Sequence, residues 1–409
     1  QIYIFFLSSH AYRGKGKMKS KMLKKAGYAI VFALSGVWAC DRTEPPVPER
    51  GRTVLIYMAA DNSLDHYAVT NLKHIAEGMK GVGGRVLIYA DRRYDVPRLL
   101  KIRGGEKPLL DTVKTYAEEN SASPVTLHRV LEEMRALCPS ESYGLILWSH
   151  GMGWLPENYS FPTGQMRRRE WDFGIPTKWF GQDVHRGEDS GREYMEIDRL
   201  AESLEGHFDF ILFDACFMSS VEVLYELRDK ADYFIVSPAE IIAEGFPYDR
   251  IMPYLYGGAD DLKRVCREYF DYYAYTPSSL YGANSATVAL VKAEELDTLA
   301  ETMRGIVGEN DGVAAAEVWR YPLSTSSLPD VFYDLGDYVK TVGTDEQRAR
   351  FQEQLKKTVV DKRATSEFFG KPVPDDKFSG LSVYIPQSRW QSMNEVYSHL
   401  SWYQTVYRH

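Results

Sequence analysis

The sequence predicts an α/β fold in which a mainly parallel sheet carries helices on both faces. Several short runs are apolar throughout, as in strands buried on both sides of a sheet. These runs alternate with segments that have the apolar spacing of helices. Strand–helix alternation is typical of parallel sheets, because each strand needs a crossover connection to reach the next. The expected strands are 54–58, 85–90, 143–148, 208–213 and 233–236.

The helices are predicted from caps and from apolar periodicity. Asp61, Asn62 and Ser63 can cap a helix that starts near Leu64. Other helices are expected over 124–137, 196–204 and 217–228. The apolar side of the first of these consists of Val125, Val130, Leu131, Met134 and Leu137. Beyond residue 260 the chain is expected to be mostly helical, until residues 380–386 form a late strand that returns to the sheet.

Two of the predicted strands end next to residues that can carry chemistry. His150 follows one strand and Cys216 follows another, 66 positions later. Active sites of open α/β sheets lie at the carboxyl ends of the strands, so these two side chains can meet there. A nearby imidazole, or the start of the helix expected from Phe217, favours the thiolate form of a cysteine. A lone cysteine is more often a buried structural thiol, and a lone histidine more often a structural hydrogen-bonding group.

The main chain beside these residues can hold a developing negative charge. The backbone N–H groups of Gly151 and of Cys216 at the expected helix start are candidates for an oxyanion hole. Gly151 has no side chain that would block the approach of a substrate carbonyl.

The segments around these residues resemble a known family. Residues 148–154 (WSHGMGW) and 213–222 (FDACFMSSVE) are similar to the two catalytic blocks of the clostripain family, cysteine peptidases of the caspase-like clan that also holds gingipains and legumain. Residues 54–64, 194–197, 332–337 and 380–386 resemble further blocks of that family, in order. The similarity runs from about 52 to about 390 and implies a caspase-like three-layer sandwich.

The resemblance implies a role for each matching residue. His150 would be the general base and acid, and Cys216 the nucleophile, of a dyad that cleaves peptide bonds. Asp214 would lie at the floor of the S1 pocket and select Arg or Lys at P1, since a buried carboxylate needs a cation; its alternative role is to cap the next helix. Glu244 stands where the family often has a second pocket acid, although Glu replaces Asp and Phe246 replaces Trp.

A long polar stretch, 155–193, separates the two catalytic blocks. It is rich in basic residues and glycine and has little periodicity, and loops of this length are usually functional or disordered. The resemblance implies cleavage between His150 and Cys216, often by the enzyme itself, which gives a monomer or a self-cleaved two-chain form. The alternative is a solvated loop that is never cut. The candidate processing sites are Arg167, Arg168, Arg169, Lys178, Arg186 and Arg192, with 167–169 preferred.

The N-terminal residues predict export. Seven basic residues and no acidic ones occur in 1–25, and an apolar stretch from Ala26 ends at Cys40. A basic region, a short apolar region and a small residue before the cut are typical of a signal peptide. We expect 1–17 to be upstream read-through, 18–39 the signal peptide, and 40–50 a proline-rich tether. A lipid on Cys40 would make the protein a bacterial lipoprotein at the cell envelope, in the periplasm or on the surface; otherwise it is secreted.

The net charge limits the classes of binding partner that are expected, and the cysteine count limits the possible disulfides. Without residues 1–39 the chain has 42 basic and 57 acidic residues, a net charge of −15, which argues against nucleic acid. The membrane is expected to be contacted by the lipid anchor only. If Cys40 is lipidated, three cysteines remain, so at least one thiol is free; Cys138 and Cys266 can pair or be separate core residues.

No metal or other cofactor is expected from the motifs. The histidines lack paired ligand spacing, and there is no loop with EF-hand spacing. Some members of the clostripain family depend on calcium, so the resemblance leaves calcium dependence open, and no sequence motif supports it.

The predicted organisation is a catalytic core at 51–260 followed by the helical part at 261–409. The leading function is an exported cysteine endopeptidase that cuts after basic residues. Its alternatives are a non-catalytic surface module that binds peptides or glycans, and a transpeptidase or esterase on the same scaffold.

Overall fold

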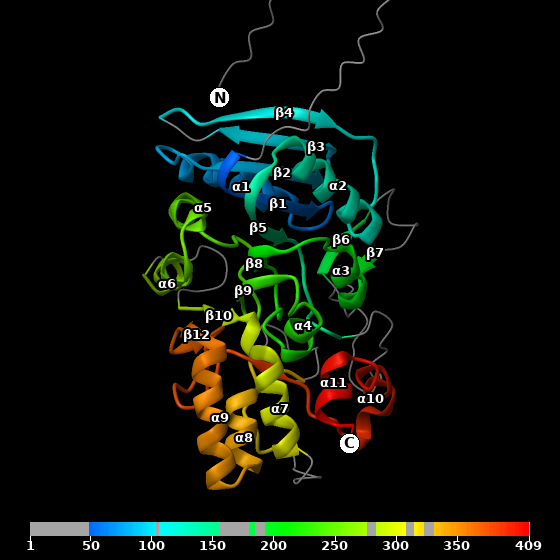
Figure 1. Cartoon of the computed structure of the whole chain (residues 1–409), viewed down its shortest axis with the longest axis vertical. Helices are drawn as coiled ribbons and strands as arrows, with labels where there is room; N and C mark the ends of the chain where they lie inside the picture. The colour runs from blue at the N-terminus through cyan, green and yellow to red at the C-terminus, as the bar shows by residue number, and fades with distance from the viewer. Residues whose placement is uncertain are drawn as a thin grey trace, which may run out of the picture. The chain divides into compact units, whose positions relative to one another are not determined.

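A nine-stranded mixed sheet runs through the centre of the structure (Figure 1). The computed structural model describes residues 49–103, 106–155, 180–184, 193–275, 284–307, 315–322 and 331–408, all within one unit formed by 46–409. The strand order is β12-β10-β9-β8-β5-β1-β2-β3-β4. The strands of this sheet are β1 Glu49–Ala60, β2 Arg85–Arg92, β3 Asp95–Arg103, β4 Leu109–Thr115, β5 Ser140–Trp148, β8 Phe208–Asp214, β9 Ala231–Val236, β10 Thr287–Lys292 and β12 Val359–Ala364.

Six shorter strands form three two-stranded sheets. They are β6 Phe180–Asp183 with β7 Glu193–Met195, β11 Tyr333–Asp334 with β15 Ser382–Val383, and β13 Glu367–Phe368 with β14 Lys371–Pro372. The described α-helices are α1 Asp65–Gly78, α2 Pro124–Leu137, α3 Ile197–Ser203, α4 Val221–Glu226, α5 Tyr248–Ile251, α6 Ala259–Tyr275, α7 Leu296–Val307, α8 Leu335–Val342, α9 Asp345–Thr358, α10 Gln391–Tyr397 and α11 Ser401–Val406. Single 3-10 turns lie at Met252–Tyr256, Ala293–Glu295 and Ser388–Trp390.

The middle of the large sheet is parallel and its two edges are antiparallel. β1 pairs in parallel with β2 and β5, β5 with β8, and β8 with β9. The outer strands β3, β4, β10 and β12 are all antiparallel to their neighbours. The predicted α/β class is therefore confirmed, and the parallel strands are the ones that carry the candidate site.

Helices cover both faces of the sheet, as the sequence predicts. Along β1, Leu55 and Tyr57 belong to one apolar cluster, and Val54 and Ile56 to the other, because successive side chains point to opposite faces. α1, α5 and α6 lie on one side in Figure 1, and α2, α3 and α4 on the other. A fully buried Leu or Ile contributes about 1.5–3 kcal/mol, so the two clusters account for much of the driving force for folding.

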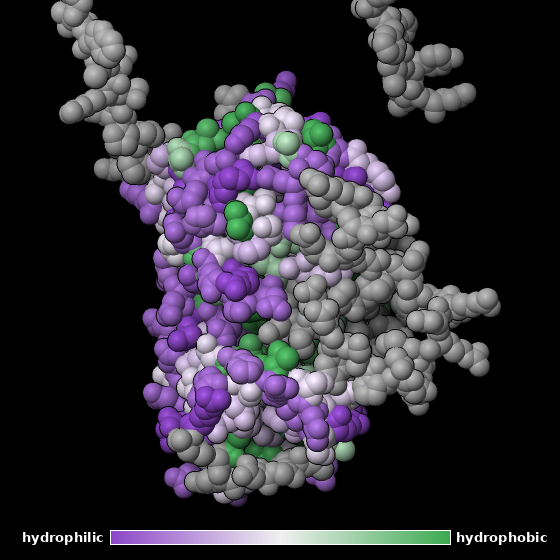
Figure 2. All heavy atoms as spheres, turned by 90° about the vertical axis from the view of Figure 1, so that its right-hand side faces the viewer, coloured by the Kyte–Doolittle hydropathy of each residue, from purple (hydrophilic) through white to green (hydrophobic). Residues whose placement is uncertain are grey.

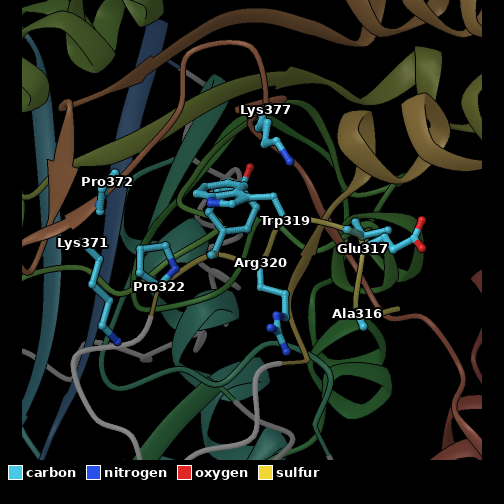
Figure 3. Close-up of a pocket in the computed structure, with 10 residues that line it drawn as sticks. Ala316, Glu317, Trp319, Arg320, Pro322, Lys371, Pro372 and Lys377 are labelled. Carbon is cyan, nitrogen blue, oxygen red and sulfur yellow. The ribbon is translucent and has the colours of Figure 1, made fainter. Parts of the chain in front are cut away.

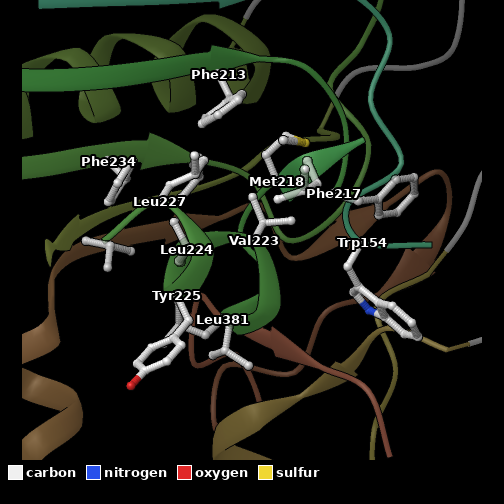
Figure 4. Packing of buried hydrophobic residues seen from close by; sticks show 14 of the residues in the cluster. Trp154, Phe213, Phe217, Met218, Val223, Leu224, Tyr225, Leu227, Phe234 and Leu381 are labelled. Atoms are coloured by element: carbon white, nitrogen blue, oxygen red, sulfur yellow. The ribbon is translucent and has the colours of Figure 1, made fainter. Parts of the chain in front are cut away.

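Figure 4 shows part of the first cluster, around α4. Phe213 and Phe234 of the sheet face Leu224 and Leu227, and all four are fully buried. Trp154 packs nearby against the ring of Tyr384, with centroids 4.8 Å apart. The segments on both sides of Cys216 are thus fixed to the core.

The surface is mainly hydrophilic in the described part of the face that Figure 2 shows. Large exposed apolar side chains occur on the β3–β4 hairpin, where Leu109 is 58 % exposed and Tyr94, just before it, 80 %. Among the described residues, no helix combines the length and the apolar character that a membrane span requires.

The C-terminal part departs from the sequence prediction. Residues 380–386 do not return to the large sheet: β15 pairs with β11, and Ser382 bridges Ser220. The reason is a turn just before β15, where Gly380 has φ +86° and Asp334 accepts hydrogen bonds from Ser379 N and Oγ, each 2.7 Å. The strands that extend the large sheet beyond residue 260 are β10 and β12 instead.

Two predictions about helices also need correction. The cap of α1 is Leu64, without a side-chain bond to the helix. Of the predicted capping residues, Asn62 does bond the entry to the helix, because its Oδ1 accepts from Leu64 N over 2.9 Å, but the capping position itself is Leu64. The bounds of α2 are confirmed, but Val125 is 73 % exposed. It lies two residues from buried Leu127, which places it on the opposite face of the helix.

Cys138 and Cys266 do not pair. Both are buried free thiols, and they belong to the two different apolar clusters on opposite faces of the sheet. Each is a separate core residue.

Candidate active site

His150 and Cys216 follow two neighbouring parallel strands at the same level. Trp148 of β5 is opposite Asp214 of β8, and Ser149 N donates to Asp214 O over 3.3 Å. His150 and Cys216 each come two residues after this registered pair. The sheet therefore brings the two predicted residues to adjacent positions on its carboxyl edge.

The imidazole of His150 contacts a residue from a third strand end. Its Nε2 lies 2.9 Å from Oγ of Ser63, in the turn after β1. His150 O also accepts a hydrogen bond from Gly181 N, 3.1 Å. The sequence prediction placed Ser63 only as a helix cap. The signal that could have revealed this contact is its position directly after the strand that pairs with β5.

The thiol of Cys216 is half-buried beneath the segment after β9. Ile241 N donates to Sγ over 3.3 Å, and Phe217 N donates to Ala239 O over 2.9 Å. Burial, followed by the negative charge of Glu240, raises the pKa of the Cys216 thiol to about 12. In this conformation the sulfur is therefore protonated at neutral pH.

The predicted helix from Phe217 is wrong at its N-terminus. Phe217 has φ +62°, a left-handed conformation that a helix cannot contain. α4 begins only at Val221, and Ser220 caps it by accepting from Val223 N over 3.3 Å. The helix N-terminus therefore does not stabilise a thiolate at Cys216.

Gly151 packs directly against the main chain of Cys216. A β-carbon at Gly151 would lie 2.8 Å from Cys216 O and 3.0 Å from Cβ of Ala215. Glycine is required here because two backbones approach each other, rather than only to admit a substrate. The oxyanion role of the Gly151 and Cys216 amides stays a prediction.

Asp214 is a buried carboxylate held by two donors. Its Oδ2 accepts from Tyr248 OH over 2.8 Å and from Phe246 N over 3.1 Å. Burial raises the pKa of Asp214 to about 6, and the two hydrogen bonds keep it from rising further. Since α4 starts seven residues later, the alternative role of Asp214 as a helix cap is wrong.

The neighbours of Asp214 come from the segment that also contains Glu244. A β-carbon at Gly245 would lie 2.5 Å from Asp214 Oδ2, and Gly245 has φ +72°. Glu244 is half-buried, and its Oε2 is buried without a hydrogen-bond partner among the described residues. The ring of Phe246 packs on Tyr269, with centroids 4.3 Å apart. Sequence reasoning named Phe246 only as a substitution and missed Tyr248.

A second group of acids lies at the same end of the sheet. Asp91 of β2 is fully buried, and neither of its carboxylate oxygens has a hydrogen-bond partner among the described residues. Burial, and then the charges of Asp183, Glu118 and Asp61, raise its pKa to about 9. The acid is therefore neutral at pH 7.

In the described part of the chain, no three His, Cys, Asp or Glu side chains are grouped so that they could hold a metal. The calcium dependence that part of the family implies stays a prediction.

A cavity of about 420 Å³ lies elsewhere, in the C-terminal part (Figure 3). Trp319, Arg320, Lys371 and Lys377 line it, and neither His150 nor Cys216 does. Trp319 N donates to Asp337 Oδ2, with which Lys377 forms an ion pair of 3.3 Å.

Several predicted residues lie outside the described part of the chain. They are Cys40, Arg167, Arg168, Arg169, Lys178, Arg186 and Arg192. The same holds for the signal peptide and for most of the tether.

Comparison with known proteins identifies the family. The clostripain family pattern (Peptidase C11) matches residues 56–405. An inactive zymogen C11 protease from Parabacteroides distasonis is 35 % identical and has a TM-score of 0.73, over 89 % of this chain and 100 % of that one. A secreted C11 cysteine protease from Bacteroides thetaiotaomicron, solved with an irreversible peptide inhibitor, is 30 % identical with a TM-score of 0.73, over 87 % and 98 %.

Clostripain of Hathewaya histolytica is 26 % identical over 236 residues, which is 50 % of this chain and 42 % of clostripain. The match thus spans less than half of that relative. Together with the nearly complete coverage of the two solved structures, it shows that the chain belongs to the clostripain family of cysteine proteases.

Proposed function

We propose that the chain is an exported cysteine endopeptidase that cleaves peptide bonds after Arg or Lys. The observation that carries the proposal is the registered pair of strand ends, which sets His150 beside Cys216 with the buried acid Asp214 two residues before the cysteine. The peptide inhibitor bound to the Bacteroides relative supports peptide substrates.

The reaction would proceed through an acyl-enzyme. Sγ of Cys216 attacks the scissile carbonyl while His150 takes the thiol proton, and the amides of Gly151 and Cys216 receive the oxyanion. His150 returns the proton to the leaving amine as the C–N bond breaks. Water, activated by the same imidazole, then hydrolyses the thioester and restores the thiol.

The preference for a basic P1 residue rests on Asp214. A carboxylate that is 4 % exposed and at the last position of β8 gains a great deal from a substrate cation, because its charge is poorly solvated. Glu244, whose buried Oε2 has no hydrogen-bond partner in the described part of the chain, is the second acid proposed to act on P1.

Self-processing between His150 and Cys216 is part of the proposal. Burial raises the pKa of the Cys216 thiol, and the hydrogen bond from Ile241 N offsets this only in part, so little reactive thiolate is present in the uncut chain. We propose that cleavage within 155–193, with Arg167 to Arg169 as the first candidates, allows the segment over Cys216 to move. The result would be a two-chain enzyme.

We propose that the protein is exported as a lipoprotein, because residues 18–40 have the pattern of a signal peptide that ends at a cysteine. The Bacteroides relative is described as secreted, and Cys40 follows the apolar stretch. Metabolic labelling with palmitate tests this route: wild type should incorporate the lipid and Cys40→Ser should not. Labelling of both proteins, or of neither, contradicts it.

The central experiment measures hydrolysis of fluorogenic peptides that differ only at P1 (Arg, Lys, Ala or Asp). Wild type and Cys138→Ala, which alters the other thiol of the first cluster, should cleave the Arg and Lys peptides, and Cys216→Ala should cleave none. A denaturing gel of the same samples should show two chains only where Cys216 is present. Turnover by Cys216→Ala would overturn the proposal.

The same experiment separates the remaining alternatives. Binding of peptides without turnover by any folded, processed form would favour a binding module. Transfer of the acyl group to an added amine in preference to water would favour a transpeptidase.

A further inference from the structure

We propose that Ser63 is a positioning residue that fixes the orientation and the tautomer of His150. The inference rests on the proposed role of His150 as the acid and base of the dyad. Its starting point is the distance of 2.9 Å between Ser63 Oγ and His150 Nε2, which is a good hydrogen-bond length.

The turn that carries Ser63 is held by a buried amide. Asn62 is fully buried, and its Nδ2 donates to Ala59 O over 2.9 Å and to Gln182 O over 2.8 Å. Its Oδ1 accepts from Leu64 N over 2.9 Å. Asn62 therefore binds β1, β6 and the residue after Ser63 at once, so the exposed Ser63 sits on a rigid support.

The backbone of His150 belongs to the same hydrogen-bonded unit. Ser149 Oγ donates to Ala59 O over 2.7 Å, and Gln182 N donates to Ser149 Oγ over 3.2 Å. Gly181 N donates to His150 O. The turn after β1 and the end of β5 are thus joined through β6, which fixes Ser63 and the imidazole relative to each other.

A serine hydroxyl can donate or accept, so the distance alone does not set the tautomer; we assign Nε2–H as the donor. When Nε2–H donates to Ser63 Oγ, the neutral imidazole keeps its lone pair on Nδ1. Nδ1 then receives the thiol proton and later delivers it to the leaving amine. Both N–H groups are donors in the imidazolium, so the bond to Ser63 persists through the cycle.

Loss of the Ser63 hydroxyl is expected to lower kcat and to leave KM nearly unchanged. A misdirected ring or the wrong tautomer slows proton transfer without changing substrate binding, and a loss of roughly 10- to 100-fold is typical of such misplacement. Stability should barely change, because Ser63 is exposed.

Three substitutions in the full-length enzyme test the inference. Ser63→Ala removes the hydroxyl, Ser63→Thr keeps it, and Ser123→Ala alters a serine whose side chain makes no cap bond to its helix. We expect Ser63→Ala to lower kcat roughly 10- to 100-fold with KM within about twofold, and Ser63→Thr and Ser123→Ala to stay near wild type. An unchanged kcat in Ser63→Ala, or a change confined to KM, would overturn the inference.

A second readout does not depend on turnover. In protein labelled with 15N in the histidine rings, the His150 signals, assigned by comparison with His150→Gln, should report the Nε2–H tautomer in wild type and a mixture in Ser63→Ala. Identical His150 signals in both proteins contradict the role of Ser63, whatever the substrate preference turns out to be. Failure of the basic P1 preference alone would leave this result intact.

Discussion

The hydroxyl of Tyr248 donates a hydrogen bond of 2.8 Å to Oδ2 of Asp214, and both residues are buried. This bond favours the charged carboxylate, so it works against the burial that raises the pKa of Asp214 to about 6. Together with the bond from Phe246 N, it therefore extends to lower pH the range in which the acid can bind a substrate cation.

Tyr248→Phe should weaken binding of basic peptides in mildly acidic solution. Loss of the donor raises the pKa of Asp214 further, and the acid must be ionised to pair with Arg or Lys. As pH falls, KM for an Arg peptide should begin to rise at a higher pH than in wild type. Tyr273→Phe is the matched control, since its hydroxyl donates to Gly245 O over 2.6 Å instead. Coincident pH profiles of Tyr248→Phe and wild type would refute the link.

Asp214→Asn should abolish the charge at this position while keeping its size. We expect kcat/KM for Arg and Lys peptides to fall about 100-fold or more, since a neutral amide cannot compensate a buried cation. Peptides with Ala at P1 should be affected far less. An equal loss for all peptides, at unchanged melting temperature, would assign Asp214 to positioning of Cys216 rather than to P1 selection.

Gly151→Ala should damage both folding and activity. The new methyl group would lie 2.8 Å from Cys216 O, so the two strand ends must separate, at a cost of about 1–3 kcal/mol in the free energy of unfolding. Gly83→Ala is the control, because nothing lies within 4 Å of its β-carbon. Chemical denaturation and peptide hydrolysis measure the two effects. Wild-type values for Gly151→Ala would show that the close approach is not required.

Asp91→Asn should stabilise the protein at neutral and alkaline pH. The folded-state pKa of about 9 is above the ordinary value, so the folded chain holds a proton that the unfolded chain releases above pH 4. Stability of wild type is therefore expected to fall between about pH 4 and 9, and the amide should remove this slope. The expected gain at pH 7 is on the order of 2–4 kcal/mol. Melting curves at pH 5, 7 and 9 for both proteins measure it, and parallel slopes would contradict the prediction.

The parallel core was predictable because its signal is local. Runs such as 54–58 and 210–213 are apolar on both faces, and the residues that follow the end of such a strand lie at the edge of the sheet. His150 and Cys216 were found this way, with the family blocks as support. Neither the local apolar pattern nor the family blocks predicted the register between the strands, because register depends on pairing between distant segments.

The errors share a physical cause, which is tertiary contact overriding local preference. Residues 217–228 read as a helix, yet Phe217 takes a left-handed conformation and stacks on Phe332, with centroids 4.5 Å apart. Residues 380–386 read as a core strand, yet the buried Asp334 bends the chain before it. Ser63 was predicted only as a helix cap and Tyr248 was not predicted at all, because their contacts with His150 and Asp214 join segments far apart in the sequence.

The last fifth of the chain is bonded to the turn that presents the nucleophile. Ser219 Oγ donates to Gly380 O over 2.6 Å, Ser382 N donates to Ser219 O over 3.0 Å, and Tyr384 N donates to Glu222 Oε1 over 2.8 Å. These contacts can form only after the chain has been synthesised at least as far as Tyr384. We therefore expect the turn after Cys216 to gain its final packing late in synthesis, so that assembly of the site waits for the C-terminal part.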